Sequence, residues 1–376
     1  MVMDYVEWPQ PDKIVTPLAT PSLSNFEKKA LLEVFESGWI GSNSPYVLDT
    51  EDSFSSFFNS KSLLVSNGSV ALMLALRSLG IKSGDEVIVP ALTYAATASS
   101  VCNVGATPVF CDVEIDSWQI SVESMLSAVT TKTKAVIVPH LYGFPADIDR
   151  VMSALQGRGV FIIEDAAEAF AAKYKNRLVG TLGDVGTFSF FPNKLITSGE
   201  GGLCVTSSEK NYDHMKSLRG QGMNSQHRYF FDEPGYNFRM TGLQAAILGA
   251  QLNRFAFLFQ AREVSQNTYR KILPKNCIEP SGNYDFTSSP WIFSCRLEGL
   301  SFEKKIALAT TLATIGIETR PVFYPLPLMR AFCRFRSTEI PNSRIIADEG
   351  ISLPTGEHVS ELTYIKISDA IRKIYA

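Results

Sequence analysis

Cysteine, histidine and long apolar runs are all scarce in this sequence of 376 residues. Its six cysteines form no CxxC pair, and with only four histidines no Cys/His spacing is typical of a zinc site. A chain of this length buries enough apolar surface to fold without disulfides. We therefore expect reduced thiols and no metal site.

No run of about 18 apolar residues is present, so we expect no membrane-spanning helix. Residues 1–13 carry Asp4, Glu7 and Asp12 and lack the basic start and apolar stretch of a signal peptide. The net charge is -3, and both signs are scattered along the chain without the basic stripe of nucleic-acid-binding proteins. The sequence thus predicts a cytoplasmic protein that binds neither membranes nor nucleic acid.

What is present is an alternation of short apolar segments with helical ones. Apolar strands separated by helices are typical of an α/β protein, with a mostly parallel central sheet and helices on both faces. The expected strands are 63–66, 86–90, 107–112, 135–138, 160–164, 185–190 and 203–206, and the expected helices between them include 70–79, 95–104, 121–128 and 148–156.

Two capping boxes mark further helices. Ser24 with Glu27 begins a helix that Gly38 ends, and Thr241 with Gln244 begins a long helical stretch that runs to Leu273. A smaller α+β region follows this stretch. We place the domain boundary inside the long helix, which predicts a large domain of residues 1–255 and a small one of residues 256–376.

The first motif with chemical meaning is Val65-Ser-Asn-Gly-Ser69, where a strand enters a turn and then a helix. Free amides at a helix start, together with the Ser69 hydroxyl, suit an anion such as a phosphate. A plain strand-to-helix connection with a serine cap explains the motif equally well when it is taken alone.

The second motif places Glu164, Asp165 and Glu168 at the end of an apolar strand. Ligands of open parallel sheets bind at this end of the strands, and a carboxylate there can keep a heteroaromatic nitrogen protonated. The alternative is that Asp165 only caps a helix.

The third motif is the segment 186–202, in which Lys194 follows an apolar strand and precedes a glycine-rich turn. A lone loop lysine is usually solvated, but a desolvated one can lose its proton and act as nucleophile or base. An anion site, an acid and an amine on one sheet are together what pyridoxal phosphate (PLP) requires.

From about residue 17 to its end, the sequence resembles the DegT/DnrJ/EryC1/StrS family of sugar aminotransferases. The resemblance implies a PLP-dependent transferase of fold type I with a smaller C-terminal α+β domain. It is carried by the three motifs above and by Gly84-Asp-Glu-Val-Ile-Val-Pro-Ala-Leu-Thr-Tyr94, His140-Leu-Tyr-Gly143, Gly235-Tyr-Asn-Phe-Arg-Met-Thr241 and Glu318-Thr-Arg-Pro-Val-Phe-Tyr324.

The resemblance also implies a role for each matching residue in cofactor binding. Lys194 is expected to bind the cofactor covalently and then to carry a proton, and Asp165 to bond the ring nitrogen. Tyr94 is expected to stack on the ring, and Glu168 to lie near the ring hydroxyl. The phosphate is assigned to Gly68, Ser69 and Ser189, with Asn237 contributed by a neighbouring subunit.

The Asn237 assignment implies a homodimer with shared active sites. Arg320 matches an arginine expected to meet the diphosphate of a nucleotide sugar, for which a bidentate guanidinium is suited. His227 and Arg228 lie in a polar loop that either touches the substrate or is simply solvated.

By resemblance, the reaction has two steps, with pyridoxamine phosphate as the intermediate form of the cofactor. An amino acid, expected to be glutamate, supplies nitrogen to a 4-keto-6-deoxy sugar linked to GDP, with UDP or dTDP as alternatives. The product is expected to enter a surface polysaccharide such as O-antigen, or alternatively an antibiotic sugar.

Two other readings are open to such a sequence. A related PLP enzyme that deoxygenates the sugar has His where this chain has Lys194, and a non-catalytic regulatory homologue would have lost Lys194 or Asp165. The chain also departs from family members at Pro192, at Phe230 and Phe231 where Trp-His is common, and at Pro327 where His is common. The last two departures lie in the expected substrate contacts.

Overall fold

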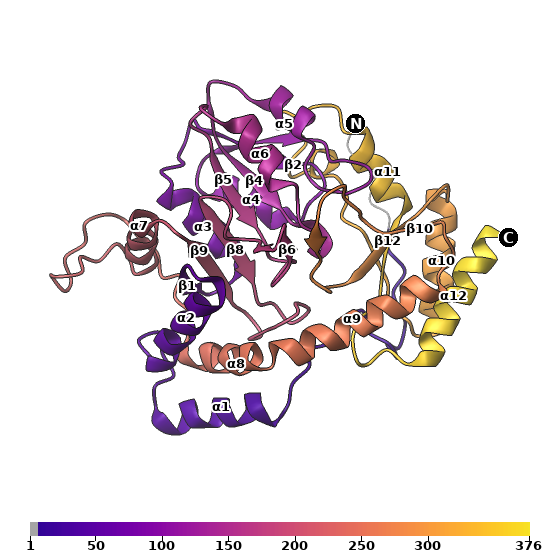
Figure 1. The fold of residues 1–376 in the computed structure, drawn as a ribbon, viewed down its shortest axis with the longest axis horizontal. Helices are drawn as coiled ribbons and strands as arrows, with labels where there is room; N and C mark the ends of the chain where they lie inside the picture. Colours follow the sequence, from indigo (N-terminus) through magenta and orange to yellow (C-terminus); the bar gives the residue numbers. More distant parts are fainter. Residues whose placement is uncertain (1–6) are drawn as a thin grey trace.

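The computed structural model describes residues 7–376, and its centre is a seven-stranded sheet in the order β1-β9-β8-β5-β4-β2-β3 (Figure 1). Neighbours from β3 to β8 in this order pair in parallel, while β9 runs antiparallel to both β8 and β1. The strands are β1 (Lys61–Val65), β2 (Glu86–Pro90), β3 (Thr107–Cys111), β4 (Thr133–Pro139), β5 (Phe161–Asp165), β8 (Val185–Ser189) and β9 (Gly202–Thr206). The predicted mostly parallel sheet is confirmed.

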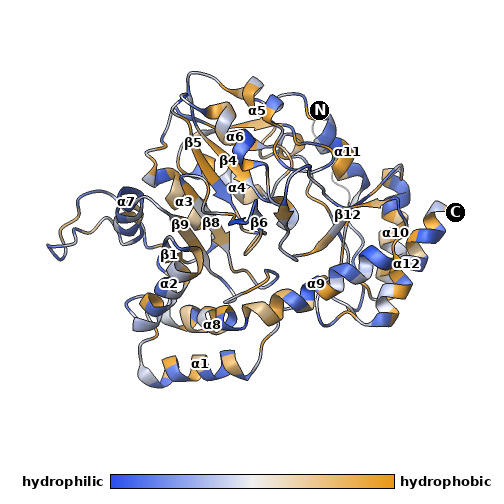
Figure 2. Cartoon of the chain, viewed as in Figure 1, coloured by the Kyte–Doolittle hydropathy of each residue, from blue (hydrophilic) through white to orange (hydrophobic). Residues whose placement is uncertain are grey.

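The strands of this sheet carry apolar side chains on both faces, so helices cover both faces. Leu64 and Ile88 pack into one apolar cluster, and Leu63 and Val87, one residue away, pack into the other. Figure 2 shows the resulting apolar strands at the centre of the molecule. One cluster includes α2 (Pro45–Phe58), α5 (Val122–Ala128), α6 (Ile148–Leu155) and α8 (Gly242–Asn253); the other includes α3 (Gly68–Ser78), α4 (Ala95–Asn103) and α7 (Glu209–Arg219).

The C-terminal part of the chain forms a second, antiparallel sheet in the order β10-β12-β14-β13. Its apolar residues form a cluster of their own with helices α10 and α12. The elements are β10 (Cys277–Ile278), β12 (Phe293–Leu297), β13 (Arg320–Pro321), β14 (Gly350–Leu353), α10 (Phe302–Thr314), α11 (Pro341–Glu349) and α12 (Glu361–Tyr375).

Short elements complete the fold. A three-stranded sheet has the order β11-β6-β7, and α1 packs along α8 on the outside of the molecule (Figure 1). These elements are α1 (Asn25–Ser37), β6 (Lys173–Tyr174), β7 (Arg177–Leu178), β11 (Phe286–Thr287) and the 3-10 turns η1 (Leu141–Gly143) and η2 (Leu326–Leu328). Within residues 7–376, no helix has both the length and the apolar character needed to cross a bilayer.

Both capping boxes form as predicted, at Ser24 and at Thr241, and Gly38 ends α1 in the left-handed conformation at φ 73. The prediction of one continuous helix to Leu273 is wrong. The helix breaks at Arg254, whose side chain turns back to donate to the Ser22 carbonyl oxygen at 3.2 Å. We propose that this break is the boundary between the large and the small domain, which the sequence placed near residue 255.

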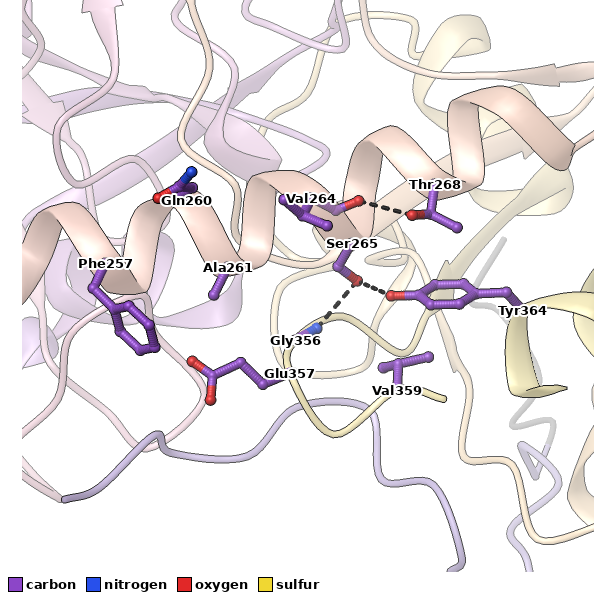
Figure 3. Close-up of a pocket in the computed structure, with 10 residues that line it drawn as sticks. All are labelled: Phe257, Gln260, Ala261, Val264, Ser265, Thr268, Gly356, Glu357, Val359 and Tyr364. Atoms are coloured by element: carbon purple, nitrogen blue, oxygen red, sulfur yellow. Dashed lines mark hydrogen bonds between the residues drawn. The ribbon is translucent and has the colours of Figure 1, made fainter. Parts of the chain in front are cut away.

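Helix α9 (Phe255–Ile272) joins the two parts of the chain (Figure 1). On the side of α9 that faces α12, the Tyr364 hydroxyl donates to the buried Ser265 Oγ at 2.6 Å, and the Gly356 N–H donates to the same oxygen at 3.2 Å (Figure 3). A groove of about 450 Å³ runs along this side of α9. The predicted site residues do not line the groove, so it is separate from the site described below.

The C-terminal core contains one fully buried lysine. Lys305 Nζ donates to the Ala347 carbonyl oxygen at 2.6 Å and lies 4.9 Å from the centroid of the Phe302 ring. Burial lowers the pKa of this amine to about 8. The charged form is therefore less stable in the folded protein than in water.

We expect Lys305→Met to remove a pH dependence of stability. Between pH 8 and 10.5 the unfolded chain holds a proton on Lys305 that the folded protein has lost, so wild-type stability rises with pH across this window relative to the variant. The gain should approach about 3 kcal/mol, at ~1.4 kcal/mol per pKa unit. Chemical unfolding at several pH values measures it. The exposed neighbour Lys304→Met is the control, and equal pH profiles for all three proteins would contradict the assignment.

Candidate active site

The segment after β8 forms a closed loop that carries Lys194. The Phe190 N–H donates to the Gly201 carbonyl oxygen at 2.8 Å, and the Thr197 hydroxyl donates to the Phe190 carbonyl oxygen at 2.7 Å. These bonds hold the two ends of the loop together at the carboxyl end of β8. Lys194 therefore lies at the edge of the sheet where ligands of parallel sheets bind.

The Lys194 amine lies in a buried site that favours its unprotonated form. Its Nζ lies 3.9 Å from the centroid of the Trp291 ring. Burial lowers the pKa of the amine, while attraction by Glu168 and Asp165 opposes this shift. A lysine removed from water loses its proton more easily and becomes a nucleophile.

Asp165, the last residue of β5, is one of two acids whose negative charge attracts the protonated form of this amine. Its side chain is buried, Oδ2 accepts from the Thr97 hydroxyl at 2.9 Å, and Oδ1 accepts from the Ala167 N–H at 3.3 Å. Burial raises the pKa of Asp165, and the Thr97 bond opposes the shift. A cationic ligand nitrogen would favour its ionised form.

Glu168 is the second acid, and it is also buried. Its Oε2 accepts from the Tyr142 N–H at 2.8 Å. Burial raises the pKa of Glu168 to about 7, against the attraction of Lys194. The site thus contains a carboxyl group that exchanges its proton near neutral pH.

A row of aromatic rings connects Lys194 to Tyr94. The Tyr142 ring lies between Trp291, at 5.8 Å between centroids, and Phe323, at 5.2 Å. Phe323 in turn lies 5.7 Å from Tyr94, whose ring is 59% exposed. The exposed Tyr94 ring is available to stack on a planar ligand.

The predicted anion site lies beside this row, at the start of α3. Asn67 caps the helix by accepting from the Val70 N–H at 3.0 Å, which leaves the Gly68 and Ser69 amides without intrahelical partners. A Cβ on Gly68 would lie 2.8 Å from Ser189 Cβ, so only glycine fits against Ser189 here. This close approach makes a cradle with amide and hydroxyl donors, which suits a phosphate.

A buried pair behind the site holds the end of β5. His140 Nδ1 accepts from the Ala146 N–H at 3.0 Å, so the ring proton is on Nε2, which donates to Glu164 at 2.9 Å. Glu164 also accepts from the Gly180 N–H at 2.7 Å and from the Leu182 N–H at 2.6 Å. Glu164 and His140 therefore support the loop around Gly180 rather than a ligand.

The other four predicted residues are exposed. Asn237 accepts from Arg239 Nε at 3.2 Å, and the carbonyl oxygen of the adjacent Phe238 accepts from the Ser66 N–H at 2.9 Å, so the segment of Asn237 runs beside the predicted anion motif. Arg320 is half-exposed and paired with Glu318. His227 and Arg228 are exposed in the segment between α7 and α8, which projects away from the sheet (Figure 1).

Three further residues at the site were given no role from the sequence: Thr97, Tyr142 and Trp291. Thr97 follows Tyr94 by three residues at the start of α4, and Tyr142 lies within the motif His140-Leu-Tyr-Gly143, whereas no local signal marked Trp291. Across residues 7–376, no cluster of His, Cys, Asp or Glu has a geometry that could hold a metal ion.

Known proteins of similar sequence act on sugar nucleotides. The chain is 39% identical to GDP-perosamine synthase of Escherichia coli O157:H7, over 96% of this chain and 98% of that protein. It is 38% identical to GDP-perosamine synthase of Vibrio cholerae, over 96% and 99% of the two chains.

Solved structures share the fold. The Streptococcus pneumoniae protein Spr1654 in its PLP form has a TM-score of 0.89 at 27% identity, over 96% of this chain and 99% of that one. A DegT DnrJ EryC1 StrS aminotransferase of Brucella abortus has a TM-score of 0.87 at 29% identity, over 94% and 96% of the two chains.

The fold, the buried amine with two acids that act on its pKa and the anion cradle define the class as PLP-dependent aminotransferases of fold type I. The chain belongs to the DegT/DnrJ/EryC1/StrS aminotransferase family, whose sequence profile matches residues 21–372. Its cofactor is pyridoxal 5'-phosphate. The donors at Gly68 and Ser189 fit its phosphate, and the Asp165 carboxylate fits its ring nitrogen as an acceptor.

We expect Glu168→Gln to change how the stability of the apoprotein depends on pH. Between pH 4.5 and 7 the folded protein keeps a proton on Glu168 that the unfolded chain has lost, so wild-type stability falls across this window relative to the variant. The fall should reach up to about 3 kcal/mol. Urea unfolding at several pH values measures it. The exposed residue Glu263 provides the control variant, Glu263→Gln. If the difference in unfolding free energy between wild type and Glu168→Gln does not change with pH, the raised pKa of Glu168 is contradicted.

Proposed function

We propose that this enzyme transfers an amino group from glutamate to the 4-keto carbon of GDP-4-keto-6-deoxymannose, the reaction of a GDP-perosamine synthase. The observation that carries the proposal is the buried Lys194 amine, whose Nζ lies 3.9 Å from the centroid of the Trp291 ring and whose pKa is lowered by burial against the attraction of Glu168 and Asp165. The substrate rests on the GDP-perosamine synthases, which are 36% to 39% identical over nearly the whole chain.

When bound, PLP supplies an electrophilic carbon and an electron-accepting ring that carries nitrogen from donor to acceptor. In our proposal Lys194 attaches the cofactor through its amine and, once released, moves a proton to and from the substrate carbon. Asp165 holds a proton at the ring nitrogen, because an ionised carboxylate stabilises a cationic partner in a site removed from water.

Glu168 and Tyr94 complete the proposed cofactor site. Glu168 has a pKa of about 7, so it can exchange a proton with the polar edge of the cofactor or with Lys194 at neutral pH. Tyr94 presents an exposed ring for stacking. Gly68, Ser69 and Ser189 supply donors to the phosphate.

The substrate side of the site is proposed to include Arg320, His227 and Arg228. Arg320 is held by Glu318, so release from that pair would be part of diphosphate binding. His227 and Arg228 are exposed in the projecting segment, and we propose that they reach the site of a second chain.

A nucleotide other than GDP is the first alternative. The chain is 36% identical to the UDP-N-acetyl-3-dehydro-alpha-D-glucosamine 3-aminotransferase of Acidithiobacillus ferrooxidans, over 82% of both chains. A regulatory role is the second, because a relative at 33% identity is named pleiotropic regulatory protein. Lys194 and Asp165 are both in place, which favours an enzyme.

We also propose a homodimer in which Asn237 of one chain reaches the phosphate site of the other. Asn237 is exposed, as this arrangement requires. Several large apolar side chains remain exposed on the single chain, which supports an interface with a second copy. Examples are Phe26, Phe35 and Tyr229, which are 69%, 70% and 72% exposed.

The biological setting is a proposal of the same kind. The chain is 30% identical, over 95% of its length, to the spore coat polysaccharide biosynthesis protein SpsC of Bacillus subtilis. We propose that the amino sugar made here enters O-antigen or another surface polysaccharide, and that the enzyme acts in the cytoplasm.

We expect purified holoenzyme with glutamate to aminate GDP-4-keto-6-deoxymannose, giving a product whose mass matches the amino sugar. The UDP and dTDP 4-keto-6-deoxy sugars should react at least about tenfold more slowly in kcat/KM, because a nucleotide pocket discriminates by lost hydrogen bonds. Mass spectrometry of the products tests this. Faster turnover of a UDP or dTDP sugar would replace GDP in the proposal.

The matched control for that assay is a pair of lysine variants. Lys194→Ala should lose at least about 10³-fold in kcat, because the covalent attachment and the proton carrier are both removed. Lys175→Ala, which changes an exposed lysine paired with Asp149, should keep wild-type turnover. Normal turnover by Lys194→Ala would rule out the proposed function.

The proposed dimer predicts a sedimentation mass of about twice 41.5 kDa at micromolar concentration. Asn237→Ala should stay dimeric and bind PLP more weakly, because one phosphate contact is lost. Sedimentation velocity and a cofactor titration followed by absorbance measure the two effects. A monomer with full affinity for PLP would contradict shared active sites.

A further inference from the structure

Arg262, on the inner side of α9, has contacts that none of the predicted roles includes. Its side chain is 6% exposed. One terminal nitrogen donates to the Asn193 carbonyl oxygen at 3.0 Å, and the other donates to the Lys194 carbonyl oxygen at 3.0 Å. A guanidinium from a distant helix thus holds two consecutive peptide groups at the proposed catalytic lysine.

This arginine has no acid to balance its charge. Among residues 7–376 no carboxylate forms an ion pair with Arg262. The acid whose charge raises the pKa of Arg262 is Glu357, and its side chain is exposed. Burial lowers the pKa of Arg262 to about 10, which still leaves it charged at neutral pH. Since an unpaired buried charge is costly, its retention indicates a role that a neutral side chain would not fill.

Trp291 holds the same loop from a second element. Its Nε1–H donates to the Asn193 carbonyl oxygen at 2.9 Å, so this oxygen accepts from both Trp291 and Arg262. The face of the same indole lies 3.9 Å from Lys194 Nζ. The Trp291 indole therefore contacts both the carbonyl oxygen of the peptide bond before Lys194 and the amine at the end of the Lys194 side chain.

We propose that Arg262 and Trp291 form a clamp that positions Lys194, with Arg262 as a positioning residue and not a catalytic one. Main-chain bonds at Asn193 and Lys194 restrict the backbone rotations that direct the lysine side chain. A cation is the stronger donor to a carbonyl oxygen, and the planar fork of arginine reaches both oxygens at once. The inference rests on the role proposed for Lys194.

The charge of the clamp has a consequence for the amine. Arg262 repels the protonated form of Lys194, whereas Asp165 and Glu168 attract it, and these are the charged groups that act on the amine. The charge of Arg262 also helps to lower the pKa of His358, which lies on the segment before α12. Removing the Arg262 charge should therefore leave a larger fraction of Lys194 protonated at neutral pH.

The clamp is tested on folded apoprotein by competitive acylation of lysines with acetic anhydride between pH 6 and 10, read for the Lys194 peptide by mass spectrometry. Arg262→Gln removes the charge and keeps one donor, and should slow labelling of Lys194 at pH 7.5 by about threefold. Arg262→Lys keeps the charge but cannot span both oxygens. It should label nearly as wild type while kcat of the holoenzyme falls about tenfold.

Arg270→Gln is the matched control. Arg270 lies on the same helix, and its donors reach Glu279, Asn267 and Gln266 rather than the Lys194 loop. It should change neither labelling nor kcat. Wild-type labelling of Lys194 in Arg262→Gln, or wild-type kcat in Arg262→Lys, would overturn the clamp.

If Arg262→Gln fails to fold, the kcat of Arg262→Lys decides alone. Because acylation is read on the apoprotein, these outcomes are separate from the proposed function, which fails only if Lys194→Ala turns over normally.

Discussion

The site depends on one physical constraint: an amine and two carboxylates are held together away from water. Burial alone would neutralise all of them, since it lowers the pKa of Lys194 and raises those of Asp165 and Glu168. Each group is therefore supported by a specific donor or neighbour. Thr97 donates to Asp165, the Tyr142 N–H donates to Glu168, and the Trp291 ring faces the amine. The balance leaves the pKa of Glu168 raised to about 7, with the pKa of Lys194 lowered and that of Asp165 raised.

The sheet explains why these groups meet. Strands β1, β5 and β8 all run in one direction, so Val65, Asp165 and Ser189 end at one edge although about a hundred residues separate the first two. The antiparallel strand β9 brings Gly202 between Val65 and Ser189. Gly68 then approaches Ser189 more closely than any side chain would allow. The anion cradle is thus a product of strand order.

The sequence predicted those parts of the fold that depend on local pattern. Apolar strands, both capping boxes and the strand-end positions of Asp165 and Lys194 follow from periodicity and spacing. The break at Arg254 was missed, because it depends on bonds to Ser22 and Glu27 more than 200 positions away. Arg262 and Trp291 were missed for the same reason, since they reach Asn193 from 69 and 98 positions away.

The central claim is that the cofactor is attached to Lys194, and reduction of the holoenzyme with sodium borohydride tests it most directly. Reduction fixes the covalent link, and digestion followed by mass spectrometry locates the added pyridoxyl group. The account predicts that this mass is found on the peptide containing Lys194 and is absent in the reduced Lys194→Ala protein. A pyridoxyl group on another lysine of an active enzyme would contradict it.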